Sequence, residues 1–301
     1  MERKFLYLVN PISGTRKKPS LVRSIKSATE KAGFAFEFMD TRADGDYTQL
    51  RQYVTANGIT DVVICGGDGS VSTVSSYLTG LDINIGIIPL GSGNGLALAA
   101  GISTSLPKAL NILLEGNSNF IDGFTINGKF SCMMCGVGND AQVAHDFASQ
   151  KTRGLKTYLR LSALNYFKSK CYPFTISVNG NSFDMDAYFI VIANSNQFGN
   201  NVTIAPRASL SDGLLDIVVV RKMSKLVLPF ALLNQIAGTN SPEKINNYRK
   251  NKNILYFQTA ELDIFNTGNA PLHIDGEPEP TTNEIKIKVI PKAFRLLQPS
   301  L

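Results

Sequence analysis

Short apolar runs alternate with helix-like segments over the first 120 residues. The run at 5–9 is apolar throughout, as expected of a strand buried on both faces. The segment 19–32 repeats apolar residues every three or four positions, which is the period of a helix. The same criteria predict strands at 5–9, 34–39, 61–65 and 85–88 and helices at 19–32, 47–56, 71–78 and 106–114. Strands that alternate with helices indicate a parallel sheet covered by helices.

The pattern changes after residue 121, where most segments have the character of strands. Asn179-Gly180 is a strong two-residue hairpin signal. Strands are predicted at 124–127, 130–135, 174–178, 188–193, 214–220, 254–257, 262–265 and 285–290, with helices at 155–167 and 225–237. This half is therefore expected to be a mostly antiparallel β-sandwich or distorted barrel. We expect two domains, 1–121 and 122–301, with the option that the last residues return to the first.

Composition narrows the class of protein. Hydrophobic residues make up 44% of the 301 residues, enough for packed cores. Four cysteines do not form a disulfide scaffold, which favours a reducing, cytoplasmic location. The long charge-free stretch 83–107 contains too many glycines and prolines for a membrane-spanning helix. The net charge of +6 is compatible with a nucleotide or an anionic lipid, whereas nucleic acid is not expected without interleaved aromatic and basic residues.

The sharpest motif is Gly66-Gly-Asp-Gly-Ser70, which follows a buried strand and precedes a helix. Glycines allow the backbone to turn tightly and approach a phosphate closely. The free N–H groups at the start of the helix can then face the anion. Asp68 is the only charge in this turn, and an acid beside a phosphate suits Mg²⁺ or the handling of a hydroxyl proton.

Two further loops follow predicted strands. Pro89-Leu-Gly-Ser-Gly-Asn94 offers a hydroxyl and an amide among glycines, and Asn10-Pro-Ile-Ser-Gly14 follows the first strand. Loops at the carboxyl ends of parallel strands converge on one crevice. Three such loops therefore predict a phosphate- or ribose-binding site there.

Other common site types are disfavoured. The sequence lacks the GxxxxGK[ST] motif of P-loop nucleotidases. Gly136-Val-Gly-Asn-Asp-Ala141 fits a dinucleotide motif but lies in the β-rich half, outside any predicted βαβ unit. His145 and His273 have no nucleophile nearby in sequence, so each is expected to be structural.

A second pair of acids occurs late in the chain. Asp275 and Glu277 flank a glycine at the end of a strand. If the backbone is extended there, both carboxylates point to the same side. A polar turn remains the alternative to a metal or base pair.

These motifs resemble, in their order, the catalytic domain of the diacylglycerol kinase, sphingosine kinase and ceramide kinase superfamily, including its bacterial lipid kinases. The resemblance covers nearly the whole chain. It rests on Asn10-Pro-x-Ser-Gly14, Gly66-Gly-Asp-Gly-Ser70, Pro89-Leu-Gly-Ser-Gly-Asn94, Gly136-x-Gly-x-Asp-Ala141 and Asp275-Gly-Glu277. Since NAD kinases and phosphofructokinases share the glycine–aspartate loop, the resemblance implies their type of α/β fold for the first domain.

The resemblance implies ATP- and Mg²⁺-dependent phosphorylation of a lipid hydroxyl. Glu277 matches the proton acceptor, with Asp275 and Asp68 as the other catalytic candidates. Asp122 matches an acid near the metal, and a structural Mg²⁺ site is implied at Ser209, Asp212 and Leu214, partly through backbone carbonyls. The expected nucleotide-binding residues are Asn10, Pro11, Ser13, Gly14, Thr41, Gly66, Gly67, Asp68, Gly69, Ser70, Ser72, Gly91, Ser92, Gly93 and Asn94.

The sequence departs from the family pattern in ways that leave the acceptor open. Ser72 stands where bacterial members often have Asn, and Gly95 where they often have Asp. Diacylglycerol, a sphingoid base, ceramide or a related lipid are all candidates. The alternatives are an NAD-kinase-like phosphotransferase acting on a soluble hydroxyl, and a nucleotide- or membrane-binding protein without turnover.

A lipid acceptor implies contact with a membrane, so a peripheral location at the inner face of the membrane is expected. The segment 151–170 carries six basic residues and no acid, with leucines interspersed, and could lie on anionic lipid or cover a core. The charge-free segment 226–242 is expected to be a core helix, with an acyl-chain pocket as the alternative. The sequence leaves a homodimer open.

Overall fold

A computed structural model describes residues 2–14, 18–150, 155–197, 203–243 and 252–300. The chain divides into two compact units, which are described separately below. The first consists of Met1–Ile121 and Lys292–Leu301, and the second of Asp122–Pro291. Two strands, β5 (Ser118–Ile126) and β15 (Glu284–Leu297), carry the chain from one unit to the other.

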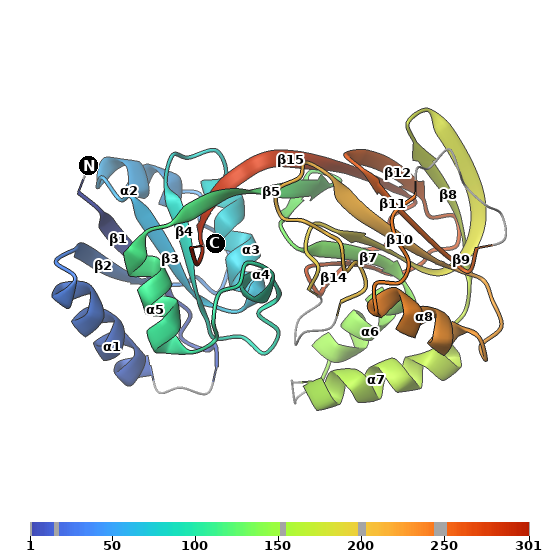
Figure 1. Ribbon diagram of the computed structural model, residues 1–301, viewed down its shortest axis with the longest axis horizontal. Coiled ribbons are helices and arrows are strands. Elements are labelled where there is room, and N and C mark those ends of the chain that lie inside the picture. Colours follow the sequence, from blue (N-terminus) through green and yellow to red (C-terminus); the bar gives the residue numbers. More distant parts are fainter. Residues whose placement is uncertain (1, 15–17, 151–154, 198–202, 244–251, 301) are drawn as a thin grey trace. The chain divides into compact units, whose positions relative to one another are not determined.

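The first unit is built on a parallel sheet in the order β2-β1-β3-β4, extended by the end of β15 (Figure 1). The inner strands β1, β3 and β4 are almost entirely buried, which explains why their sequences show no alternation, whereas no residue of the edge strand β2 is fully buried. Their bounds are β1 Lys4–Val9, β2 Ala35–Asp40, β3 Asp61–Gly66 and β4 Asn84–Pro89.

Helices cover both faces of this sheet. α1 (Lys18–Lys31) and α5 (Leu106–Glu115) pack on the face that contains Phe5, Tyr7 and Val63. α2 (Leu50–Ala56) and α3 (Asp68–Leu78) contact each other and lie on the other face, as right-handed crossovers require when the strand order reverses (Figure 1). The reversal falls between β1 and β3, which is where ligands bind in open α/β sheets.

The second unit is a mostly antiparallel assembly in the order β14-β13-β7-β9-β8-β12-β15, with β10 and β11 added through β9. The long β9 (Asn181–Ala193) pairs with β8 (Tyr172–Val178) along its first half. Its second half pairs with both β7 (Met134–Gly138) and β10 (Leu215–Arg221). This change of partners lets one continuous sheet fold over on itself into two layers.

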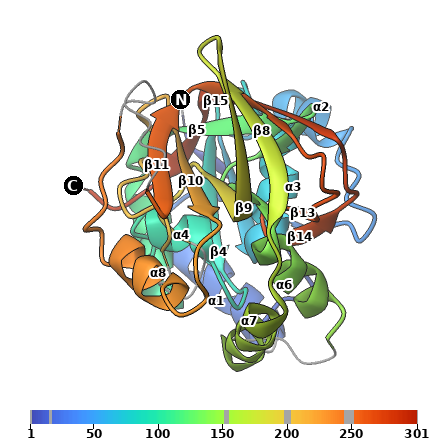
Figure 2. The same ribbon diagram turned by 90° about the vertical axis from the view of Figure 1, so that its right-hand side faces the viewer.

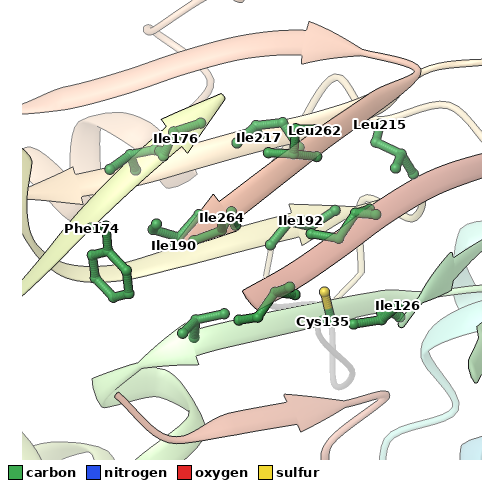
Figure 3. Close-up of a cluster of buried hydrophobic side chains, with 14 of the residues drawn as sticks. Ile126, Cys135, Phe174, Ile176, Ile190, Ile192, Leu215, Ile217, Leu262 and Ile264 are labelled. Atoms are coloured by element: carbon green, nitrogen blue, oxygen red, sulfur yellow. The ribbon is translucent and has the colours of Figure 1, made fainter. Parts of the chain in front are cut away.

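The remaining elements of the second unit complete these layers and their helical cover. Its other strands are β6 Lys129–Ser131, β11 Ile254–Thr259, β12 Glu261–Phe265, β13 Leu272–Ile274 and β14 Glu277–Glu279. Its helices are α6 Asn139–Ala148, α7 Leu155–Lys168 and α8 Leu228–Ile236. Side chains such as Ile190, Ile217 and Leu262 fill the core (Figure 3).

The expected fold class, a parallel α/β domain followed by an antiparallel β-sandwich, is confirmed. Several details differ. α3 begins at Asp68 rather than at Val71, and the strand expected at 130–135 is broken between β6 and β7. α6 and the short α4 (Gly95–Ala99) were not predicted, because each begins at a glycine–asparagine boundary, Gly138-Asn139 and Asn94-Gly95, that has the composition of a turn.

The segment expected to form a core helix shows the largest difference. α8 forms, but most of its large apolar side chains are exposed. Within the described ranges, none of the helices is both long and apolar enough to cross a membrane.

Candidate functional site

Two of the three predicted loops meet at the point where the strand order reverses. Asn10 follows β1, and its backbone N–H donates to the carbonyl of Cys65 in β3 at 3.0 Å. Its side-chain Nδ2 donates to Ser70 Oγ at 2.9 Å. Its Oδ1 accepts from the N–H of Ile12 at 3.0 Å, which fixes the turn after β1. The Asn10 amide therefore links the loop after β1 to the start of α3.

Glycines allow the loops after β3 and β4 to approach backbone to backbone. A Cβ built on Gly91 would lie 2.6 Å from the Cα of Gly67, and one on Gly67 would lie 3.0 Å from the Cα of Gly91. Gly14 has φ +70°, and its Cβ would lie 2.8 Å from the carbonyl oxygen of Leu90. Larger residues at these positions would separate the three loops. The structure thus brings together the three glycine-bearing motifs found in the sequence.

The first turn of α3 contains the acid and hydroxyl of the central motif. Because the helix begins at Asp68, the N–H groups of Asp68, Gly69 and Ser70 precede the first backbone bond of the helix, from Val71 N to Gly67 O at 3.1 Å. Such N–H groups and the helix dipole favour an anion. Ser72 lies in the next turn and is buried. The motif is therefore a helix N-terminus, with Asp68 as its acidic first residue.

The loop after β4 is closed by its own asparagine. Asn94 adopts a left-handed conformation with φ 52°. Its Oδ1 accepts from the N–H of Gly91 and its Nδ2 donates to the carbonyl of Gly91, both at 2.8 Å. Ser92, between them, is exposed. The sequence suggested that the Asn94 amide contacts a ligand, but in the structure this amide stabilises the loop. The exposed hydroxyl of the loop belongs to Ser92.

The other predicted nucleotide contacts lie at the edges of this loop cluster. Thr41 follows β2, and its N–H donates to the carbonyl of Val9 at 2.9 Å. The Lys18 ammonium donates to the carbonyl of Ser13, and burial lowers the pKa of Lys18. Pro11 is exposed, and Gly93 is partly exposed. The neighbouring residues Arg16 and Lys17, noted in the sequence as basic, lie outside the described residues.

The second unit brings the four predicted metal residues together. Asp122, only 2% exposed, accepts from the N–H of Gly213 through Oδ2 at 2.7 Å. Its own N–H donates to the carbonyl of Leu210 at 2.6 Å. Asp212 Oδ1 accepts from the N–H of Leu214 at 3.1 Å. The loop 209–214 is therefore fastened onto Asp122.

The electrostatics of this cluster fit a hard cation with oxygen ligands. Burial, and secondarily the charge of Asp122, raise the pKa of Asp212. The Asn194 Nδ2 bonds to the carbonyls of Asp122 and Cys132 at 2.9 and 3.0 Å, but its buried Oδ1 has no partner among the described residues. Two carboxylates and an unpaired amide oxygen are ligands that Mg²⁺ or Ca²⁺ accepts.

Side chains alone would not complete the coordination. The described parts of the chain contain no group of three or more His, Cys, Asp or Glu residues suited to a metal ion. Backbone carbonyls or water would have to supply the remaining ligands. Asn194 was missed in the sequence, although the polar run Asn194-Ser195-Asn196 directly after a buried strand was a readable signal.

The expectation that Asp275 and Glu277 point to the same side is wrong. Asp275 and Gly276 have φ values of 49° and 82° and form a two-residue turn between β13 and β14, so the backbone is not extended. Asp275 Oδ1 accepts from Ser131 Oγ at 2.6 Å and from the N–H of Met134 at 3.0 Å. Glu277 lies on β14 and is exposed. The two carboxylates thus have different environments.

A buried histidine supports this turn. His273 is 3% exposed, and its Nδ1 accepts from the N–H of Gly276 at 3.2 Å. Its Nε2 therefore carries the proton that faces Asp140 Oδ2 at 3.3 Å. A Cβ built on Gly136 would overlap the Asp140 carboxylate and come within 2.5 Å of His273 Nε2. Gly136 in the motif at 136–141 thus leaves space for the buried pair of Asp140 and His273. This agrees with the expectation that His273 is structural.

Two family descriptions cover most of the chain. Residues 4–126 match the diacylglycerol kinase catalytic domain, and residues 133–298 match the YegS C-terminal NAD kinase beta sandwich-like domain. The fold and the loop cluster are thus those of a kinase with a diacylglycerol-kinase-type catalytic domain. The chain belongs to the family of YegS-like proteins in which these two domains follow each other.

Relatives agree with this assignment, and a solved structure shares the fold. The chain is 28% identical to a protein named "Probable lipid kinase YegS-like" from Shewanella frigidimarina, over 87% of this chain and 84% of that protein. It is 29% identical to "Probable lipid kinase YegS" from Salmonella arizonae, over 80% and 79%. A crystal structure of a diacylglycerol kinase from Bacillus anthracis has the same fold, with a TM-score of 0.75 at 19% identity, covering 99% of this chain and 97% of that one.

Proposed function

We propose that this protein is an ATP- and Mg²⁺-dependent lipid kinase that transfers the γ-phosphoryl group to a lipid hydroxyl. The observation that carries the proposal is the joining of three glycine-bearing loops at the reversal point of the first sheet. The Asn10–Ser70 bond and the Gly67–Gly91 approach hold these loops together. Relatives named as lipid kinases support a lipid acceptor.

In this proposal the first unit binds ATP. The N–H groups at the start of α3 bind phosphate oxygens, and Ser70, Ser92 and Ser13 offer hydroxyls. The proposed nucleotide contacts are those named from the sequence, except that the Asn94 side chain acts by holding its loop. Phosphoryl transfer depends mainly on positioning and charge neutralisation, so a cluster of rigid backbone donors suits it.

The acids of the proposal have separate roles. Glu277 takes the proton of the lipid hydroxyl, because its exposed carboxylate makes no hydrogen bond or ion pair to any other described residue. Asp275 holds the turn, and Asp68 lies beside the phosphates. Bound Mg²⁺ would offset the charge of the transferred phosphoryl group. Asp122, Asp212 and the carbonyls of Ser209 and Leu214 would hold a structural Mg²⁺.

The acceptor is proposed to be diacylglycerol, a sphingoid base, ceramide or a related lipid, reached by a peripheral protein at the inner face of the membrane. A direct test incubates the protein with γ-labelled ATP, Mg²⁺ and each of diacylglycerol, a sphingoid base, ceramide, phosphatidylglycerol and polyprenol. Label in one lipid product supports the proposal. Phosphorylation of NAD alone would instead support a kinase for a soluble acceptor, and ATP binding without turnover would support a non-catalytic protein.

The assignment of Glu277 is tested by Glu277→Gln. This variant should bind ATP normally and lose at least a hundredfold in turnover, because a general base contributes about 10²–10⁴-fold. Glu279→Gln on the same strand, which removes only the ion pair of Glu279 with Lys129, is the matched control. If turnover in Glu277→Gln is near normal, Glu277 is not the proton acceptor, and Asp68 and Asp275 remain as candidates.

A further inference from the structure

α8 presents its apolar side chains to the outside. Leu226, just before the helix, is 84% exposed, Phe230 is 69% exposed and Leu233 is 62% exposed. Phe230 and Leu233 are three residues apart and share one face of α8, and Leu226 lies in the turn that leads into the helix; these three residues are hereafter the α8 ridge. Clustered exposed apolar side chains mark an interaction surface. A single exposed leucine would need no such explanation.

The inward face of α8 fixes this orientation. Its buried residues are Leu228 and Gln235. The Gln235 Nε2 donates to the carbonyl of Ile204 at 2.8 Å, and its Oε1 accepts from Asn240 Nδ2 at 2.9 Å. Because a satisfied buried amide is costly to expose, the helix is held in this rotation. The α8 ridge therefore does not result from a loosely packed helix.

The end of α7 extends the apolar surface. Phe167 is 76% exposed and Leu164 is 47% exposed. The Lys225 ammonium donates to the carbonyl of Phe167 at 2.8 Å, and the Tyr166 hydroxyl donates to the carbonyl of Lys225. These two bonds place the end of α7 beside the start of α8, and both helices lie at the same end of the second unit (Figure 2). The exposed Phe167 therefore lies on the segment that is bonded to Lys225, the residue next to Leu226.

The two segments that form this surface carry basic residues and no acid of their own, and Asp186 on the neighbouring β9 is paired with Lys222. Lys168, Lys170 and Lys225 are exposed around the apolar residues. The sequence has no Asp or Glu in 155–183 or in 222–242. A basic rim around an exposed apolar stripe is the pattern of a surface that lies at the interface of an anionic bilayer. A protein partner for this surface would need acidic groups opposite the lysines and apolar groups opposite the exposed side chains. An anionic bilayer offers both, through its headgroups and its acyl chains.

We propose that the α8 ridge, together with Phe167 and the adjacent lysines, is the surface by which this protein inserts into an anionic lipid bilayer. The inference deepens the proposed function, because it names the surface at which a lipid acceptor would be met. It assigns insertion to α8, whereas the sequence had suggested adsorption through the basic segment 151–170. The apolar side chains enter the acyl region and the lysines remain among the headgroups.

The absence of tryptophan from the chain permits a direct test. Phe230→Trp places the only tryptophan of the chain on the α8 ridge, and Phe265→Trp places it at an exposed position of β12 as the matched control. With vesicles of phosphatidylglycerol and phosphatidylcholine, the emission of the first variant should shift to shorter wavelength and be quenched by brominated lipid. The control should show neither effect.

Binding itself is measured by co-sedimentation with the same vesicles. Phe230→Ser combined with Leu233→Ser should lower the partition coefficient at least tenfold, with an unchanged circular dichroism spectrum, while Phe265→Ser should not lower it. Unchanged binding by the double variant would overturn the proposal. The proposal would also be overturned if neither protein binds vesicles and the wild type is a dimer whereas the double variant is a monomer.

The test separates this inference from the proposed function. If no lipid is phosphorylated but the α8 ridge mediates vesicle binding, the surface stands and the lipid-kinase proposal fails. If lipid dispersed in detergent is phosphorylated equally by wild type and double variant, and neither protein binds vesicles, the kinase proposal stands and the surface fails.

Discussion

At the scale of single residues, the nearby acids Asp275 and Glu277 differ in their hydrogen bonds and therefore in their proposed roles. Asp275 accepts from a hydroxyl and a backbone N–H, whereas Glu277 is exposed two residues later. The sequence alone predicted both as candidates, because their spacing is visible but the turn between them is not. A left-handed conformation at an Asp-Gly pair could have been anticipated, since this pair favours such turns.

The different tasks lead to different consequences of substitution. Asp275→Asn should lower the free energy of unfolding by about 1–3 kcal/mol, because the amide satisfies Ser131 and Met134 less well. Glu277→Gln should change it by less than about 0.5 kcal/mol, as is usual for an exposed side chain. Urea unfolding of the two variants measures both values. An equal loss in both would contradict the division of tasks.

The acids around the loop 209–214 lead to a prediction about cations. Mg²⁺ should raise the thermal midpoint of the wild type, because it relieves the repulsion between Asp122 and Asp212. Asp212→Asn should abolish this increase without lowering the midpoint in EDTA, since the asparagine oxygen can still accept from Leu214. Asp186→Asn, an exposed acid elsewhere in the second unit, is the control. A full Mg²⁺ effect in Asp212→Asn would exclude this site.

At the scale of elements, hydrophobic periodicity predicted the strands and the larger helices, but it did not predict where the helices begin. β1, β3 and β4 are fully buried runs, and their position followed directly from their sequence. α3 begins with Asp-Gly-Ser, which has the composition of a turn, and this hid its first turn. The rotation of α8 could not be predicted either, because periodicity marks an apolar stripe without saying what covers it.

The packing of β1 on α1 predicts a dependence of stability on alkaline pH. Tyr7 is fully buried and donates to Thr29 Oγ1 at 2.8 Å, while Thr29 donates to the carbonyl of Ile25. Burial raises the pKa of Tyr7 to about 12. The folded state thus keeps its phenol protonated where the unfolded chain ionises. The stabilising contribution is complete below about pH 10 and is lost as the pH rises toward 12.

Tyr7→Phe isolates this effect, because all other groups titrate alike in both proteins. At pH 8 the wild type should be more stable by about 1 kcal/mol, owing to the hydrogen bond. Between pH 10 and 11 this advantage should shrink and reverse. Urea unfolding at pH 8, 10 and 11 measures the difference. A constant difference across these values would contradict the raised pKa.

At the scale of the whole molecule, the ends of the chain belong to the same unit. β15 leaves the second unit and pairs with β4 through Arg295 and Leu296. Leu296 and Leu297 are fully buried, and Leu297 belongs to the core of the first unit. The sequence predicted a strand only for 285–290, because Pro291 and Lys292 interrupt the apolar run before it resumes at Phe294.

Removal of residues 292–301 should therefore unfold the first unit selectively. Each large buried side chain lost costs about 2–5 kcal/mol, so the loss of Phe294, Leu296 and Leu297 approaches the total stability of a domain. Cys65 should then react with Ellman's reagent, while Cys132 and Cys135 remain protected. Deletion of Ser300 and Leu301 alone is the control. Continued protection of Cys65 in the larger deletion would contradict the prediction.

The return of β15 also has a consequence for synthesis on the ribosome. The first 121 residues emerge early, but the strand β15 that pairs with β4 is translated only after the whole of the second unit. The edge of β4 therefore stays without this partner until the second unit has been synthesised, and an open strand edge invites pairing with other chains. Emergence of β15, rather than emergence of the first 121 residues, is the step after which the first unit can acquire its native sheet.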